Sequence, residues 1–151
     1  MNSGVDDAIE GLHLAFSGEP KPASVDACEC CLSKEELEEL VTTPLRQLAP
    51  EQLSEYASCV TLTAGSEGDF RYLLPRILDV SVHGQFSWPD HEQICMNLAR
   101  GEWLSWPEPL KASIVDLFSA AWESAIANDD GWKADELVCG FALAGIDIHP
   151  S

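Results

Sequence analysis

The stretch "PEPLKASIVDLFSAAWESAIA" (residues 107–127) carries the strongest helical pattern in the sequence. Its apolar residues recur every three or four positions, so they share one broad face of an α-helix. That face consists of Leu110, Ile114, Leu117, Phe118, Ala121, Trp122 and Ala125. We therefore predict a long helix over residues 107–127 that lies in the core of the protein.

The same spacing recurs towards the N-terminus. A first apolar stripe, which ends near Gly18, comprises Val5, Ala8, Ile9, Leu12 and Phe16. Ser33 followed by Glu36 is typical of a capping box, and it predicts a short helix with Leu37, Leu40 and Val41 turned inward. Pro50 lies where a first helical turn tolerates proline, and it opens a helix that carries Leu53, Tyr56, Ala57 and Val60.

Three more helices are predicted on either side of residues 107–127. "DFRYLLPRILDVSV" (residues 69–82) begins with Asp69 as the expected N-cap, and Pro75 predicts that this helix is kinked or divides in two. Trp88-Pro89-Asp90 opens a helix with Ile94 and Leu98 inward, and a last helix near residues 133–144 ends at Gly145. The five tryptophans are expected to anchor the packing or to act as wedges between helices.

Strand signals are scarce, since "CVTLT" (residues 59–63) is the only short β-branched run. We predict an all-α protein in which residues 1–151 form a single helical domain of about seven helices. The short proline- and glycine-containing connections favour antiparallel helix pairs. HEAT-like stacking is left open, because no sequence repeat of fixed period is found.

The charge of the chain is strongly acidic. Twenty-six Asp and Glu outweigh eight Lys and Arg, which gives a net charge of −18. This charge argues against binding to nucleic acid or to an anionic membrane, and it is compatible with a basic partner, a cationic ligand or solubility alone. No apolar run reaches the roughly 18 to 20 residues of a membrane helix, and the acidic N-terminus does not resemble a secretory signal. A cytoplasmic protein is expected.

The segment "DACECCLSKEEL" (residues 26–37) holds Cys28, Cys30 and Cys31 just ahead of a helix start. A structural zinc ion needs four ligands, and this cluster supplies only two or three of them. No second closely spaced cysteine pair occurs elsewhere in the sequence to complete the set. A redox-active thiol pair is less favoured, because no predicted strand precedes the cluster as it does in thioredoxin-like sites. A structural disulfide is also less favoured, because disulfides are unusual in a reducing cytoplasm. We favour buried, metal-free cysteines here and at positions 59, 95 and 139; if zinc is bound, Cys28, Cys30 and Cys31 are its predicted ligands.

The combination of "ACECCLSKEEL", "DFRYLLPRIL" and Trp-Pro turns resembles a family of small bacterial helical proteins. The resemblance spans roughly residues 12–123, and its most specific positions are Cys28, Cys30, Cys31, Tyr56, Asp69, Phe70, Arg71, Leu74, Pro75 and Arg76. It implies an α-helical fold and a bacterial source, and it carries over no activity. Relatives would be expected to continue beyond "IDIHPS" (residues 146–151) into another helix.

The segment "DFRYLLPR" (residues 69–76) has two interpretations. Asp69, Arg71 and Arg76 could form ion pairs within the protein. They could also hold a carboxylate or phosphate ligand, since arginine presents a planar fork of donors. The sequence has only four arginines, which makes this pair a candidate ligand site.

No phosphate-binding glycine loop, nucleophile elbow, zinc-protease motif or EF-hand loop is present. We therefore predict a non-enzymatic protein that docks a basic partner, most concretely a bacterial immunity or antitoxin-like protein that binds a toxin. Its predicted contacts are Glu35, Glu36, Glu38 and Glu39. The alternatives are a small enzyme or ligand-binding domain that uses Arg71 and Arg76, and a zinc-stabilised structural module.

Overall fold

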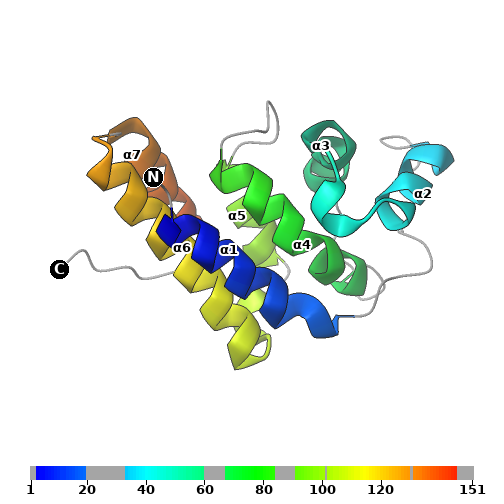
Figure 1. The fold of residues 1–151 in the computed structure, drawn as a ribbon, viewed down its shortest axis with the longest axis horizontal. Coiled ribbons are helices and arrows are strands. Elements are labelled where there is room, and N and C mark those ends of the chain that lie inside the picture. Colours follow the sequence, from blue (N-terminus) through cyan, green and yellow to red (C-terminus); the bar gives the residue numbers. More distant parts are fainter. Residues whose placement is uncertain are drawn as a thin grey trace. The chain divides into compact units, whose positions relative to one another are not determined.

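The computed structural model describes residues 3–19, 33–59, 67–83, 91–100, 102–129 and 131–145. Within these ranges the protein is all-α, with seven α-helices, three 3-10 helices and no strand (Figure 1). The chain divides into two compact units, residues 1–15 with 91–151 and residues 16–90. The all-α prediction is confirmed, whereas one domain, antiparallel pairs and HEAT-like stacking stay predictions.

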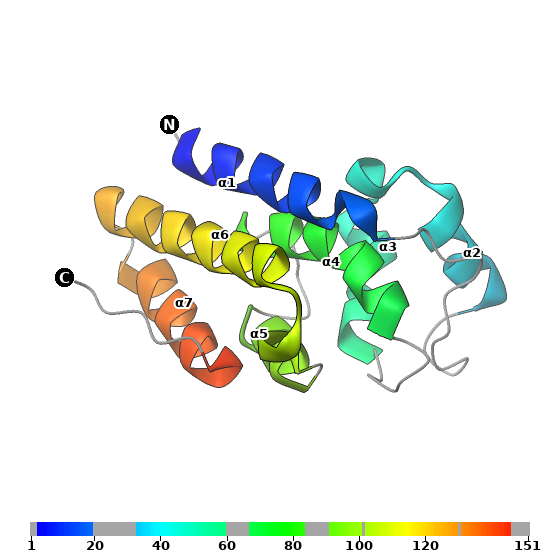
Figure 2. The same ribbon diagram turned by 90° about the horizontal axis from the view of Figure 1, so that it is seen from below.

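The first unit joins the N-terminal helix to the C-terminal helices. It contains α1 (Ser3–Ala15), α5 (His91–Arg100), η3 (Trp103–Ser105), α6 (Glu108–Ala127) and α7 (Gly131–Ala144). α6 packs against α1 and α7, and α7 packs against α5. Figure 2 shows α6 between α1 and α7, so α6 is the central helix of this unit.

The core of the first unit follows the predicted stripes. Of the seven apolar residues predicted to face inward on α6, six are buried and Trp122 is half-buried. On α1, Val5, Ile9 and Leu12 are buried. Each large aliphatic or aromatic side chain that is buried in this way stabilises the fold by about 1.5–3 kcal/mol.

The described tryptophans of the first unit differ widely in burial, and Trp122 is half-buried. Trp103 and Trp106 are buried, with 1% and 2% of their surface exposed, as expected of packing anchors. Trp132, near the start of α7, is 83% exposed. The prediction that tryptophans anchor the packing is therefore wrong for Trp132, because α7 turns Ala134, Leu137 and Gly140 towards the core instead.

The second unit is built around α4. It contains η1 (Phe16–Gly18), α2 (Lys34–Thr42), η2 (Leu45–Gln47), α3 (Pro50–Cys59) and α4 (Glu67–Val82). α4 contacts η1, η2 and α3, while α2 packs against α3. Seven apolar side chains of α4 are buried, namely Phe70, Leu73, Leu74, Ile77, Leu78, Val80 and Val82.

Two details of α4 differ from the sequence prediction. The helix begins at Glu67, so Asp69 lies in its first turn and is not its N-cap. The helix also continues through Pro75 as one element, which excludes a division into two helices. Proline removes the hydrogen bond to the carbonyl of Arg71, and the buried apolar residues on both sides of Pro75 offset that loss.

None of the described helices has the length and apolar character needed to span a bilayer.

Candidate functional site

The side of α2 that faces away from the core carries Glu35, Glu38 and Glu39, and we call these three residues the α2 acidic face. All three side chains are exposed. Their spacing of three and four residues places them on one side of the helix. Leu40 (0% exposed) and Val41 (7%) occupy the other side. Packing of the apolar side therefore presents three carboxylates to solvent together.

Glu36, the fourth predicted contact, has a local structural role. Ser33 Oγ accepts a hydrogen bond from the Glu36 backbone N–H at 3.1 Å, and Glu36 Oε1 accepts one from the Ser33 N–H at 3.1 Å. This is the predicted capping box, which satisfies two backbone donors at the start of α2. Glu36 therefore fixes the first turn of α2 and, through it, the position of the acidic face.

The arginine pair of α4 makes ion pairs within the second unit. Arg71 Nη1 lies 3.6 Å from Glu19 Oε1, which comes from the segment just after η1. Arg76 Nη1 donates to Asp79 Oδ2 at 2.9 Å, and Arg76 Nε donates to the carbonyl of Leu48 at 3.0 Å. Both guanidinium groups are thus engaged by oxygen atoms of the protein itself.

Asp79 connects Arg76 to a histidine at the end of α4. His83 Nδ1 lies 2.8 Å from the Asp79 carbonyl oxygen and 3.1 Å from Asp79 Oδ1. Because both neighbours are acceptors, Nδ1 must carry the hydrogen. Asp79 is buried, with 8% of its surface exposed. This Arg76–Asp79–His83 cluster was missed in the sequence, although the spacing of three and four residues along one helix was a usable signal.

Asp69 belongs to the first turn of α4, and its side chain lies outside the described part of the structure.

Tyr72, the residue after Arg71, has a shifted pKa. Burial of the Tyr72 side chain raises the pKa of its phenol above the ordinary value of about 10, because desolvation disfavours the phenolate.

The cysteine cluster of residues 28, 30 and 31 lies outside the described residues, so its zinc or metal-free character stays a prediction. Cys95 is buried, as predicted, whereas Cys139 is exposed. The prediction that Cys139 is buried is therefore wrong. The buried side of α7 contains Leu137 and Gly140, and Cys139 lies on the exposed side. In the described ranges, no three His, Cys, Asp or Glu side chains are grouped as metal ligands would be.

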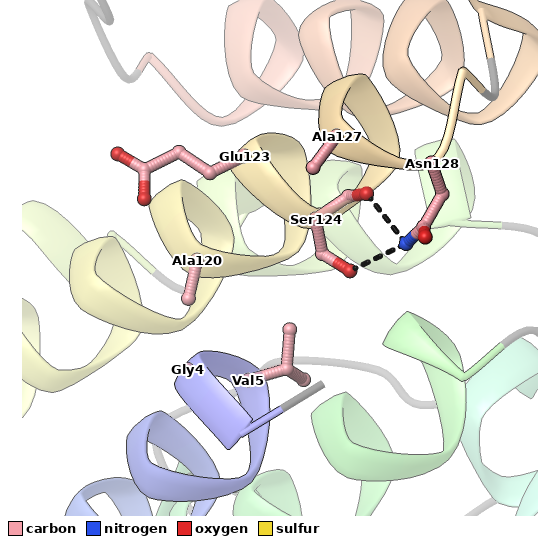
Figure 3. A pocket seen from close by; sticks show the side chains of 7 residues that line it. All are labelled: Gly4, Val5, Ala120, Glu123, Ser124, Ala127 and Asn128. Carbon is pink, nitrogen blue, oxygen red and sulfur yellow. Dashed lines mark hydrogen bonds between the residues drawn. The ribbon is translucent and has the colours of Figure 1, made fainter. Parts of the chain in front are cut away.

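A second surface feature lies where the start of α1 meets the end of α6. Val5, Ala120 and Ala127 line a cleft of about 240 Å³ (Figure 3). Glu123 stands at one edge, and at the other the Asn128 amide donates to the Ser124 carbonyl at 2.8 Å. This cleft could not be predicted from local sequence patterns, because α1 and α6 are separated by most of the chain.

No protein-family model matches the sequence, and no match is found among curated proteins or solved structures. The resemblance to a family of small bacterial helical proteins stays a prediction.

Proposed function

We propose that this protein is a non-enzymatic binding module that docks a basic protein partner, as a bacterial immunity protein or antitoxin binds its toxin. The observation that carries the proposal is the α2 acidic face on a chain of net charge −18. Its three exposed carboxylates lie on one side of a helix whose other side is fixed in the core. A rigid row of like charges is suited to lysines and arginines on a facing protein.

The net charge supports this proposal at long range. A field of this sign attracts a cationic partner and increases the rate of encounter, and the effect weakens as salt screens the charges. At short range, Glu35, Glu38 and Glu39 would each accept hydrogen bonds from cationic donors, which are stronger than neutral ones. Glu36 would contribute mainly through the helix geometry that it maintains.

The alternative ligand site at Arg71 and Arg76 has less support. Arg76 already donates to Asp79 and to the Leu48 carbonyl, and Arg71 is paired with Glu19. An anionic ligand at these guanidinium groups would also lie close to the carboxylates of Asp79 and Glu19, which would repel it. A zinc-stabilised structural role for Cys28, Cys30 and Cys31 is compatible with partner docking, because it would act through folding.

The experiment begins with co-purification of the partner from bacterial cells that produce the tagged protein. The affinity of the recovered partner is then measured for a triple variant of the α2 acidic face, Glu35→Gln, Glu38→Gln and Glu39→Gln. We expect a loss of affinity of at least tenfold and a steep decrease of binding with salt.

The control removes three charges from exposed positions outside α2, with Glu51→Gln, Glu102→Gln and Asp116→Asn. This variant has the same net charge as the first, and we expect its affinity to fall by less than threefold. Equal losses in both variants would show that only overall charge matters. A recovered partner that is acidic, or whose binding is insensitive to salt, would overturn the proposal.

A further inference from the structure

The end of the first unit where α6 turns into α7 exposes large apolar side chains. Trp132, the second residue of α7, is 83% exposed, and Ile126, close to the end of α6, is 52% exposed. α6 ends at Ala127, and Asn128 is its C-cap. The next residue, Asp129, has a left-handed backbone conformation with a φ of 58°. The turn therefore brings both apolar side chains to the same end of the α6–α7 pair.

The cleft between α1 and α6 lies at this end too. On α6, at 3.6 residues per turn, Glu123 falls between the cleft-lining Ala127 and the exposed Ile126. The volume of the cleft, about 240 Å³, is below the roughly 300–1,000 Å³ of small-molecule sites. The cleft is thus of a size for one side chain of a partner, with an apolar lining and a carboxylate at its edge.

Acidic residues surround these apolar groups. Residues 122–136 contain five acidic residues and one lysine. Glu123 and Asp129 are exposed on the α6 side, and Asp135 is exposed one turn after Trp132 on the same face of α7. Apolar contact area inside a ring of carboxylates complements a segment that has both apolar and cationic side chains.

We propose that Ile126, Trp132 and the cleft beside Glu123 form a docking patch for a basic amphipathic helix of another protein. This inference rests on the proposed function, because it takes a partner of the same class, a basic protein, and assigns it a surface within the first unit. Charge favours a basic partner over a second copy of this chain, because two copies that each carry −18 repel one another. A lysine or arginine of the partner lies over the Trp132 ring as a cation–π contact.

The cleft receives another cationic side chain of the same helix. Its aliphatic stem packs against Val5, Ala120 and Ala127, and its charged head reaches Glu123 at the edge, as long basic side chains do when they cover apolar surface. Tryptophan is among the residues that carry most of the binding energy in protein interfaces. Trp132 is therefore the residue whose removal weakens binding most.

The test uses a synthetic 18-residue peptide of leucine and lysine, with leucines spaced at i, i+3, i+4 and i+7 so that they form one helix face. Binding to the full chain is measured by calorimetry, and the indole N–H resonance of Trp132, assigned with Trp132→Phe, is followed by NMR. We expect this resonance to shift on titration. The double variant Ile126→Ser with Trp132→Ser should bind at least tenfold more weakly.

The control is the double variant Leu14→Ser with Leu104→Ser, which removes two other exposed apolar side chains of 75% and 54% exposure. It should change affinity by less than twofold. Equal losses in the two double variants, or a titration that leaves the Trp132 resonance unmoved, would overturn the docking patch.

The proposed function has a separate readout in the same experiment. If the triple variant of the α2 acidic face loses the peptide while Ile126→Ser with Trp132→Ser keeps it, docking of a basic partner stands and the patch is wrong. If the unaltered protein does not bind the peptide, or binds it equally at low and high salt, the docking patch is overturned, and the proposed function is decided separately by the charge and salt dependence of the recovered partner.

Discussion

The Arg76–Asp79 pair should stabilise the fold far more than an exposed pair of the same spacing and length. Arg76 Nη1 and Asp79 Oδ2 are 2.9 Å apart, with 19% and 12% of their side chains exposed. Lys111 Nζ and Glu108 Oε2 are 3.1 Å apart with the same i, i+3 spacing, but the glutamate side chain is 80% exposed. The two pairs differ in burial, and Arg76 also donates to the Leu48 carbonyl, so the Lys111–Glu108 pair serves as the exposed reference.

The expected magnitudes follow from these contacts. Arg76→Met removes two hydrogen bonds of a charged donor, and each such bond contributes about 1.5–3 kcal/mol when it is buried. Because Arg76 is partly exposed and water can replace some of the loss, we expect the free energy of unfolding to fall by about 2–4 kcal/mol. Lys111→Met should cost about 0.2–0.5 kcal/mol, as exposed i, i+3 pairs do.

Urea unfolding measures the loss of unfolding free energy in both variants. Far-UV circular dichroism follows all the helices, and tryptophan fluorescence follows residues 91–151, which hold four of the five tryptophans. Double-mutant cycles with Asp79→Asn and Glu108→Gln isolate each pair. We expect a coupling of about 1–2 kcal/mol for Arg76 with Asp79 and less than about 0.5 kcal/mol for Lys111 with Glu108. Equal couplings would refute the assignment of Arg76 to a stabilising internal network.

Two further predictions concern single groups. The pKa of the Tyr72 phenol is raised in the folded protein, so the stability that the neutral phenol contributes is complete below the unfolded-state pKa of about 10 and is lost as pH rises through the folded-state pKa. Tyr72→Phe should therefore flatten the decrease in unfolding free energy above about pH 10. An unchanged slope would contradict this prediction. Alkylation of the native protein with iodoacetamide, followed by peptide mass spectrometry, should modify Cys139 and spare Cys95 until urea is added, whereas rapid native modification of Cys95 would show that its site is open.

The sequence predicted the helices well because local patterns determine them. The stripe of residues 107–127 became α6, and the capping box of Ser33 and Glu36 is present as predicted. The error at Asp69 arose because helix starts depend on the backbone of the preceding loop. Cys139 and Trp132 were misjudged because a helix with apolar residues on several sides does not reveal which side faces its neighbours.

The candidate site could be predicted only in part. The α2 acidic face follows from helical spacing alone, since three glutamates recur opposite Leu40 and Val41. The partners of Arg71 and Arg76 could not be predicted fully, because Glu19 and Leu48 come from other elements. The cleft likewise combines residues from α1 and α6, and its formation depends on tertiary packing.

Binding kinetics can separate the roles of net charge, the α2 acidic face and the docking patch. Removal of three carboxylates changes the net charge from −18 to −15, whether they come from α2 or from control positions. Long-range attraction depends on the total field, so both variants should lower the association rate by a similar factor of less than about three. Salt at physiological strength, with a screening length of about 8 Å, should reduce even this difference.

Short-range contacts act on dissociation, which accounts for most affinity differences between variants of one interface. The triple variant of the α2 acidic face should therefore dissociate from the recovered partner at least about tenfold faster, while its charge-matched control dissociates at the original rate. Ile126→Ser with Trp132→Ser leaves the charge at −18, so it should associate at the original rate and dissociate faster. If this uncharged change slowed association instead, Trp132 would act in the encounter itself, and its assignment as a contact of the final complex would be wrong.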